Sequence, residues 1–190
     1  MKEKKNYEEN FVVTSKEDGK KYWISKACAV SVVIYCFSSD PNNNGYFLVH
    51  KRGIGCPDNN GKWSVNCGYV GWHEKLKKAA VREVYEEIGL ELNPSQLFLI
   101  GINDPIDTIN ENITHRYLVV LDEESVRDKI KNNIINKDSF LRGGEKDEIE
   151  TIELIPATID SIYQLEKESG WAFSHEILLK DVIDKYIFHD

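Results

Sequence analysis

The chain has 190 residues, enough for one domain that buries a core without disulfide or metal crosslinks. Apolar residues make up 41% and charged residues 29%, which excludes an intrinsically disordered chain, and no apolar run reaches the roughly 20 residues of a membrane-spanning helix. The net charge of −8 argues against a broad nucleic-acid-binding surface. The polar start and four cysteines without zinc-ligand spacing indicate a cytoplasmic protein with reduced thiols.

Residues 1–21 are polar and rich in lysine, and we expect them to form a loosely held arm ahead of one domain at 22–190. Such an arm leaves a homodimer open, because it could exchange between two copies of the chain. We expect a small-molecule ligand rather than a membrane or nucleic acid as the binding partner, since the composition supports neither of the latter.

The first half of the domain predicts three strands and the clearest helix. β-branched residues at 27–37 predict a buried strand, and a dense turn signal connects it to a second strand at 46–51 in a hairpin. A short third strand is expected at 62–66. Good helix formers at 74–88, followed by Gly89 as the residue after the last turn, predict a helix.

The second half interleaves strands with helices. We expect strands at 97–102, 115–121 and 149–155, and helices at 123–135, 158–168 and 174–187. A charged loop with two glycines lies at 140–147, just before the last strand. This order predicts a mixed α/β fold in a single domain.

Three carboxylates lie on one side of the predicted helix at 74–88. At about 100° per residue, Glu83, Glu86 and Glu87 fall within an arc of roughly 100°, beside the apolar arc. Like charges at these spacings repel, so either water solvates them or a cation neutralises them. Hard oxygen ligands favour Mg²⁺, Mn²⁺ or Ca²⁺ over zinc, and a Mg²⁺ site of this kind suits the hydrolysis of a phosphoanhydride. A solvated charged face is the alternative that the three glutamates alone leave open.

The spacing around this helix carries more information than the glutamates alone. Gly68 is followed by five residues, Glu74, seven residues and then Arg-Glu-Val-Tyr-Glu-Glu-Ile-Gly-Leu at 82–90. The stretch resembles the Nudix box (Gly-x5-Glu-x7-Arg-Glu-U-x-Glu-Glu-x-Gly-U, where U is aliphatic) at every specified position. This resemblance implies a Nudix hydrolase, a three-layer α/β/α sandwich with a mixed sheet that cleaves a nucleoside diphosphate linked to another moiety.

By position, the resemblance implies roles for the residues of the box at 68–90. Four of them would form the metal site: Gly68 through its backbone, Glu83, Glu86 and Glu87. Arg82 would orient the carboxylates by ion pairing, Glu74 would anchor the loop to the helix, and Gly89 would cap the helix. The resemblance thus predicts Mg²⁺ or Mn²⁺ as the cofactor.

The resemblance leaves the general base open, because the family does not place it consistently. Glu83 and Glu86 in the box are candidates, and so are Glu145 and Glu148 in the charged loop. We favour Glu148, which immediately precedes the strand expected at 149–155. The predicted catalytic set is therefore Glu83, Glu86 and Glu148.

Three residues outside the helix are candidates for substrate contacts. Arg52 follows a strand and precedes a glycine-bearing loop, where a guanidinium could bind phosphate. Trp72 lies in the loop of the box, where an indole ring could stack on a nucleobase. Arg142, beside two glycines, is a further phosphate candidate.

The substrate class follows from a second, shorter resemblance. Trp-Ala-Phe-Ser-His-Glu-Ile at 171–177 resembles a C-terminal stretch of ADP-ribose pyrophosphatase-like members, which favours ADP-ribose or a nucleotide sugar. Dinucleotide polyphosphates, oxidised nucleoside triphosphates and capped RNA ends stay open. Two other functions also stay open: a module that senses a nucleotide sugar without cleaving it, and an isopentenyl diphosphate isomerase, for which Cys67 is the suggestive nucleophile.

Overall fold

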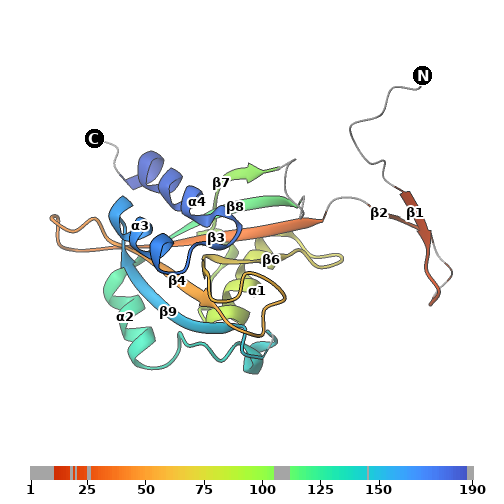
Figure 1. The fold of residues 1–190 in the computed structure, drawn as a ribbon, viewed down its shortest axis with the longest axis horizontal. Coiled ribbons are helices and arrows are strands. Elements are labelled where there is room, and N and C mark those ends of the chain that lie inside the picture. The colour runs from red at the N-terminus through yellow and green to blue at the C-terminus, as the bar shows by residue number, and fades with distance from the viewer. Residues whose placement is uncertain are drawn as a thin grey trace, which may run out of the picture.

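The computed structural model describes residues 11–17, 19, 21–24, 27–104, 112–144 and 146–187, and centres on a seven-stranded sheet (Figure 1). Its strands are β3 (Cys28–Phe37), β4 (Tyr46–Arg52), β5 (Trp63–Ser64), β6 (Asn66–Tyr69), β7 (Phe98–Asn103), β8 (Ile113–Asp122) and β9 (Ile149–Pro156). The α-helices of the described residues are α1 (Leu76–Ile88), α2 (Glu123–Lys131), α3 (Ile159–Glu168) and α4 (His175–Val182), the last continued by a π-helical turn at Ile183–Ile187. Apart from β6, which was not expected as a strand of its own, these elements match the expected ones within a few residues, and they confirm the mixed α/β fold.

The long strand β3 organises the sheet, whose main path runs in the order β5-β4-β3-β8-β7. Its C-terminal half, at 34–36, pairs antiparallel with β4, which confirms the predicted hairpin. Its N-terminal half, at 29–32, pairs antiparallel with β6, the first segment of the box. On the other side β3 runs parallel to β8 along its whole length, and β9 adds to β4, so the sheet is mixed.

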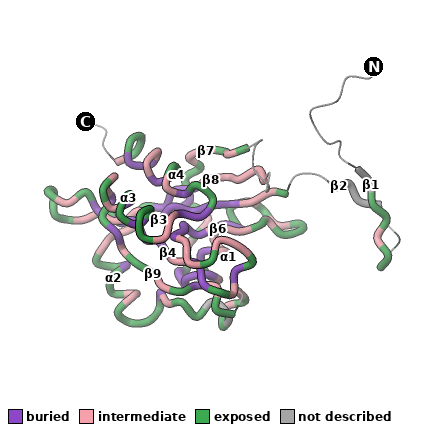
Figure 2. The backbone as a smooth tube through the Cα atoms, in the orientation of Figure 1, coloured by how far each residue is buried: buried purple, intermediate pink, exposed green. Residues whose placement is uncertain are grey.

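Alternation along the strands gives the sheet two apolar faces. Val32 and Ile34 pack in one core with Ala80 and Val84 of α1, while Val33 packs in a second core. Helix α2 also contributes to the first core, and α3 and α4 contribute to the second. Buried segments therefore follow the sheet between the two helical layers (Figure 2), which confirms the three-layer α/β/α sandwich.

The box helix begins at Leu76, two residues after the expected start, because Glu74 belongs to the turn ahead of it. The backbone N–H of Glu74 donates to the Gly71 carbonyl at 3.2 Å, and its own Oε2 accepts from the Gly71 N–H at 2.9 Å. The predicted loop at 140–147 also contains a short 3₁₀ turn at Ser139–Arg142.

The N-terminal region contains regular structure where we expected only a loose arm. Strands β1 (Phe11–Thr14) and β2 (Lys21–Ile24) pair antiparallel in a sheet of their own, and Gly19 between them has a φ of 68°. This hairpin runs past residue 21, where the sequence placed the end of the arm; residues 1–10 lie outside the described residues. No helix in the described part of the chain is long and apolar enough to cross a bilayer.

Candidate active site

One arginine joins the box helix to the loop that precedes it. The Arg82 guanidinium uses all five of its N–H groups. Its Nε and Nη2 donate to the two carboxylate oxygens of Glu74 at 2.9 Å, and Nη2 also donates to the Tyr69 carbonyl. Its Nη1 donates to Glu83 Oε1 and Glu86 Oε2, both at 2.8 Å. Arg82 therefore sits among the carboxylates as their internal counter-charge.

Glu87 is a buried acid at the edge of the sheet, with only 2% of its surface exposed. Its Oε2 accepts hydrogen bonds from Asn66 Nδ2 at 2.7 Å and from the backbone N–H of Cys67 at 3.2 Å, both on β6. Burial nevertheless raises the pKa of Glu87 well above its ordinary value, against the lowering by the Asn66 bond. A carboxylate in this position is costly unless a positive charge approaches it.

Glu83 lies directly against the backbone of the box loop. A Cβ placed on Gly68 would collide with the Glu83 carboxylate, so only glycine permits this approach. Burial raises the pKa of Glu83 to about 7, against the charge of Arg82, and the negative charges of Glu86 and Glu148 raise it as well.

The charged loop before β9 brings a fourth acid toward the box. The Gly53 N–H donates to the Glu148 carbonyl at 2.7 Å, which fixes this loop against the end of β4. The Glu148 charge raises the pKa of both Glu83 and Glu87, so its carboxylate faces the same region. Glu145, the other base candidate in the loop, lies outside the described residues.

The C-terminal end of α1 is fixed by two devices. Gly89 adopts a left-handed φ of 77°, and its N–H donates to the Tyr85 carbonyl at 2.9 Å. Arg142 donates from Nε to the Tyr85 carbonyl at 2.8 Å, from Nη2 to the Glu87 carbonyl at 3.1 Å, and from Nη1 to Asn136 Oδ1 at 2.7 Å. Arg142, named above as a further phosphate candidate, thus donates to carbonyls at the end of the helix.

These acids fit a divalent cation by the chemistry of their donors. Within the described ranges, no three His, Cys, Asp or Glu side chains converge as a complete ligand set, because Arg82 and Asn66 bind the carboxylate oxygens. The set consists of hard oxygen donors, it is partly buried, and its negative charges raise one another's pKa. Because Gly68 has no side chain, its backbone lies directly beside the Glu83 carboxylate.

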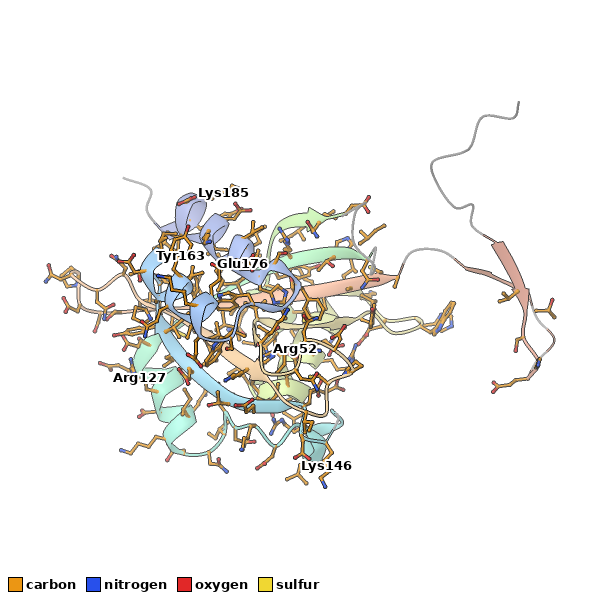
Figure 3. The ribbon with its side chains drawn as sticks, in the orientation of Figure 1. Arg52, Arg127, Lys146, Tyr163, Glu176 and Lys185 are labelled. Carbon is orange, nitrogen blue, oxygen red and sulfur yellow. The ribbon has the colours of Figure 1, made fainter. Side chains whose placement is uncertain are left out.

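The two predicted substrate contacts have different surroundings. Arg52 is 7% exposed, its Nη2 pairs with Asp58 Oδ1 at 3.0 Å, and its guanidinium carbon lies 5.0 Å from the centre of the Phe173 ring (Figure 3). Trp72 is 82% exposed. Phe173 belongs to the segment 171–177 named above, but its positive φ of 54° and its contact with Arg52 depend on the fold and could not be predicted.

Two buried histidines lie on the side of the sheet near β5. His175 Nδ1 lies 3.2 Å from Ser64 Oγ and accepts from the Val65 N–H at 3.3 Å. Burial lowers the pKa of His175 and of His50 to about 3, so both rings are neutral near pH 7. Our sequence reasoning missed His50, because a histidine inside an apolar strand carries no local signal of burial.

Cys67 is a poor candidate for a nucleophile. Burial raises the pKa of its thiol, and the charge of Glu87 raises it further, so the thiol stays protonated near neutral pH. The isomerase hypothesis loses the reactive thiolate on which it depended.

The comparisons with known proteins agree with this geometry. The NUDIX domain model matches residues 29–169, more than half of the chain. The chain therefore belongs to the Nudix family. The box at 68–90 is the Nudix motif of this fold, and its Arg82 binds the carboxylates of Glu74, Glu83 and Glu86.

Solved structures share the Nudix fold at low sequence identity. A bifunctional NMN adenylyltransferase/ADP ribose pyrophosphatase from Francisella tularensis, complexed with AMP and a Mn ion, has a TM-score of 0.61 at 16% identity over 85% of this chain and 42% of that one. A Nudix hydrolase from Alicyclobacillus acidocaldarius has a TM-score of 0.60 at 15% identity, covering 84% and 92%. The Nudix domain of Shewanella oneidensis NrtR, complexed with ADP ribose, has a TM-score of 0.56 at 12% identity, covering 85% and 89%.

The chain spans less than half the length of some of these proteins, including 45% of a MutT/Nudix family protein from Enterococcus faecalis. A comparison with curated proteins found no match. The likeness to these structures therefore shows the fold, and the substrate must be argued from the site.

Proposed function

We propose that this Nudix hydrolase is a Mg²⁺- or Mn²⁺-dependent pyrophosphohydrolase that cleaves the diphosphate of ADP-ribose or a related nucleotide sugar. The observation that carries the proposal is the group of acids Glu83, Glu86 and Glu87 on one side of α1, of which the first two bind Arg82, with Glu83 against the bare backbone of Gly68. Two of these acids have raised pKa values because they are buried, which is the environment in which a divalent cation stabilises them most.

The chain's residues would divide the work in the following way. Glu83, Glu86 and Glu87, with the backbone at Gly68, would bind the cation, which would supply Lewis-acid polarisation of a phosphoryl oxygen. Arg82 and Glu74 would keep the carboxylates in place. Glu148, whose charge reaches the same acids, would accept the proton from the attacking water. Because a raised pKa also lets Glu83 hold a proton, it stays the alternative base.

The bond changes follow from the chemistry of a diphosphate. Water adds to one phosphorus, the bridging P–O bond breaks, and its oxygen leaves with the other phosphorus, so ADP-ribose would give AMP and ribose 5-phosphate. Charge that develops on the phosphoryl oxygens would be stabilised by the cation and by fixed positive groups nearby.

The substrate class is supported by two independent likenesses. The segment 171–177 resembles ADP-ribose pyrophosphatase-like sequences, and two proteins with this fold are named for cleaving or binding ADP-ribose. Trp72, which is largely exposed, is the candidate for stacking on the base. We assign Arg52 to the lining of the site. To bind a phosphate, its guanidinium would have to break the ion pair with Asp58.

The test is a hydrolysis assay on ADP-ribose with and without Mg²⁺, using the wild type, a Glu86→Gln, Glu87→Gln double variant and a Glu91→Gln control. We expect the double variant to lose at least about 100-fold in turnover, because two cation ligands lose their charge. Glu91 is an exposed acid just beyond the helix, so its variant should match the wild type. Equal turnover by the double variant, or ADP-ribose binding without cleavage by the wild type, would contradict the proposal.

A further inference from the structure

A row of three polar residues crosses the sheet beside the box. Arg116 of β8 pairs in register with Ser31 of β3, and Ser31 pairs with Cys67 of β6. Val30 and Val32, the neighbours of Ser31, point into the core under α1, so the row lies on the opposite face of the sheet, toward α4.

Arg116 is a half-buried cation to which the described residues give no hydrogen-bonded partner. Its guanidinium forms no hydrogen bond or ion pair within the described part of the chain, whereas the other four arginines each donate to an oxygen. Desolvation lowers the pKa of Arg116, and the nearby Asp181, which raises it, is itself 3.5 Å from Lys185. A partly desolvated guanidinium in this position is stabilised when an anion arrives.

The next position in the row also has an unsatisfied polar atom. The hydroxyl of Ser31 is fully buried and has no hydrogen-bond partner. Buried polar atoms without partners are rare in proteins and commonly mark places where a water or a ligand binds. Two neighbouring polar groups without partners thus occur on one stretch of the sheet.

The row leads directly to the carboxylates of the box. Cys67, at its far end, donates its backbone N–H to Glu87 Oε2 at 3.2 Å. Two strand spacings separate the backbones of Arg116 and Cys67, which corresponds to about 10 Å. The charge of Arg116 lowers the pKa of His175 at the start of α4, so the guanidinium lies over this face of the sheet, where it would meet a phosphate that extends from the box over the same face.

We propose that Arg116 is a substrate-binding residue of this hydrolase, which pairs with a phosphate oxygen of the diphosphate on the side away from Glu87. The inference rests on the proposed function for its substrate class and adds a residue that the box does not contain. It assigns Arg116 to binding: its loss should raise KM and leave kcat nearly unchanged, because the guanidinium does not touch the attacking water.

The experiment measures ADP-ribose and AMP binding by titration calorimetry without added metal, so that cleavage is not needed for a signal. We expect Arg116→Gln to weaken binding of ADP-ribose about tenfold or more, and Arg116→Lys to recover part of it, because lysine keeps the charge but not the two-pronged geometry. Arg127→Gln is the matched control, since Arg127 belongs to α2 and pairs with Glu123 at 2.6 Å (Figure 3).

A second measurement covers the case in which Arg116→Gln does not fold. Phenylglyoxal modifies accessible guanidinium groups, and ADP-ribose should protect Arg116 in the wild type, as read by peptide mass spectrometry. Unchanged affinity in the folded variant, absence of protection, or no binding of either nucleotide by the wild type would overturn the proposal. If the wild type binds ADP-ribose through Arg116 but does not cleave it, the proposed hydrolysis fails while the assignment of Arg116 stands.

Discussion

Two arginines on opposite sides of β6 have opposite surroundings. Arg82 donates all five of its N–H groups to oxygens of the box, at 2.8–2.9 Å, whereas Arg116 donates to none in the described part of the chain. The first arrangement is internally satisfied and holds acids in position. The second leaves, among the described residues, a guanidinium and a neighbouring buried hydroxyl without hydrogen-bond partners, which are groups that a bound ligand or water can satisfy.

The largest effect should come from replacing Arg82 by lysine. A single ammonium group cannot donate five bonds, so the carboxylates of Glu83 and Glu86 would repel each other and turn. We expect kcat/KM for ADP-ribose to fall more than about 100-fold, with a lower Tm. Arg127→Lys, at an exposed pair on α2, should leave both unchanged. Full activity in Arg82→Lys would show that Arg82 is not the organiser of the acids.

The two buried histidines should make the free energy of unfolding depend on pH. His50 and His175 have folded-state pKa values of about 3 against an ordinary 6.5, so the stability they contribute is complete above pH 6.5 and is lost as pH falls toward 3. At pH 5 each should cost about 2 kcal/mol.

Glu83 acts with the opposite sign, because its raised pKa destabilises the fold as pH rises from 4.5 to about 7. A comparison of variants therefore isolates the histidines. We would measure the free energy of unfolding in urea at pH 7 and at pH 5. Its decrease between the two pH values should be smaller for His175→Gln than for the wild type. For His73→Gln, whose ring is exposed, the decrease should equal that of the wild type. If the free energy of unfolding decreased equally from pH 7 to pH 5 in the wild type and in His175→Gln, the assignment of a buried, neutral ring would be refuted.

A smaller effect is expected from Gly68→Ala. The added methyl group meets the flexible end of Glu83, so the fold should survive while that carboxylate is displaced. We expect activity to fall about tenfold and half-saturation by Mg²⁺ to rise, with a Tm close to that of the wild type. Gly101→Ala, where a Cβ meets nothing within 4 Å, is the control. A Gly68→Ala enzyme with normal metal dependence would exclude the glycine from the metal site.

The sequence predicted most of the fold because its signals are local. The β-branched run of β3, the helix formers of α1 and the cap at Gly89 each depend on neighbours in the chain, and the structure confirms them. The spacing of the box also placed three acids on one side of α1. The bonds that Glu83 and Glu86 accept from Arg82 could be expected from sequence, but the Asn66 bond that holds Glu87 could not, because it joins a strand to a helix.

The contacts that the sequence could not predict join segments that are distant in the chain. Arg116 is one of several charged residues near a strand end until the register sets it beside Ser31 and Cys67. The bonds of Arg142 could not be predicted for the same reason, because its carbonyl partners are more than fifty positions away. The arm at 1–21, a homodimer and a cytoplasmic location stay predictions.

The most direct measurement is the binding of Mn²⁺ in the presence of AMP, followed by titration calorimetry in the wild type and in a Glu83→Gln, Glu87→Gln variant. If the buried carboxylates form the cation site, the wild type takes up Mn²⁺ and the variant binds it at least about tenfold more weakly. Equal uptake by the two proteins, or none by the wild type, would contradict that claim.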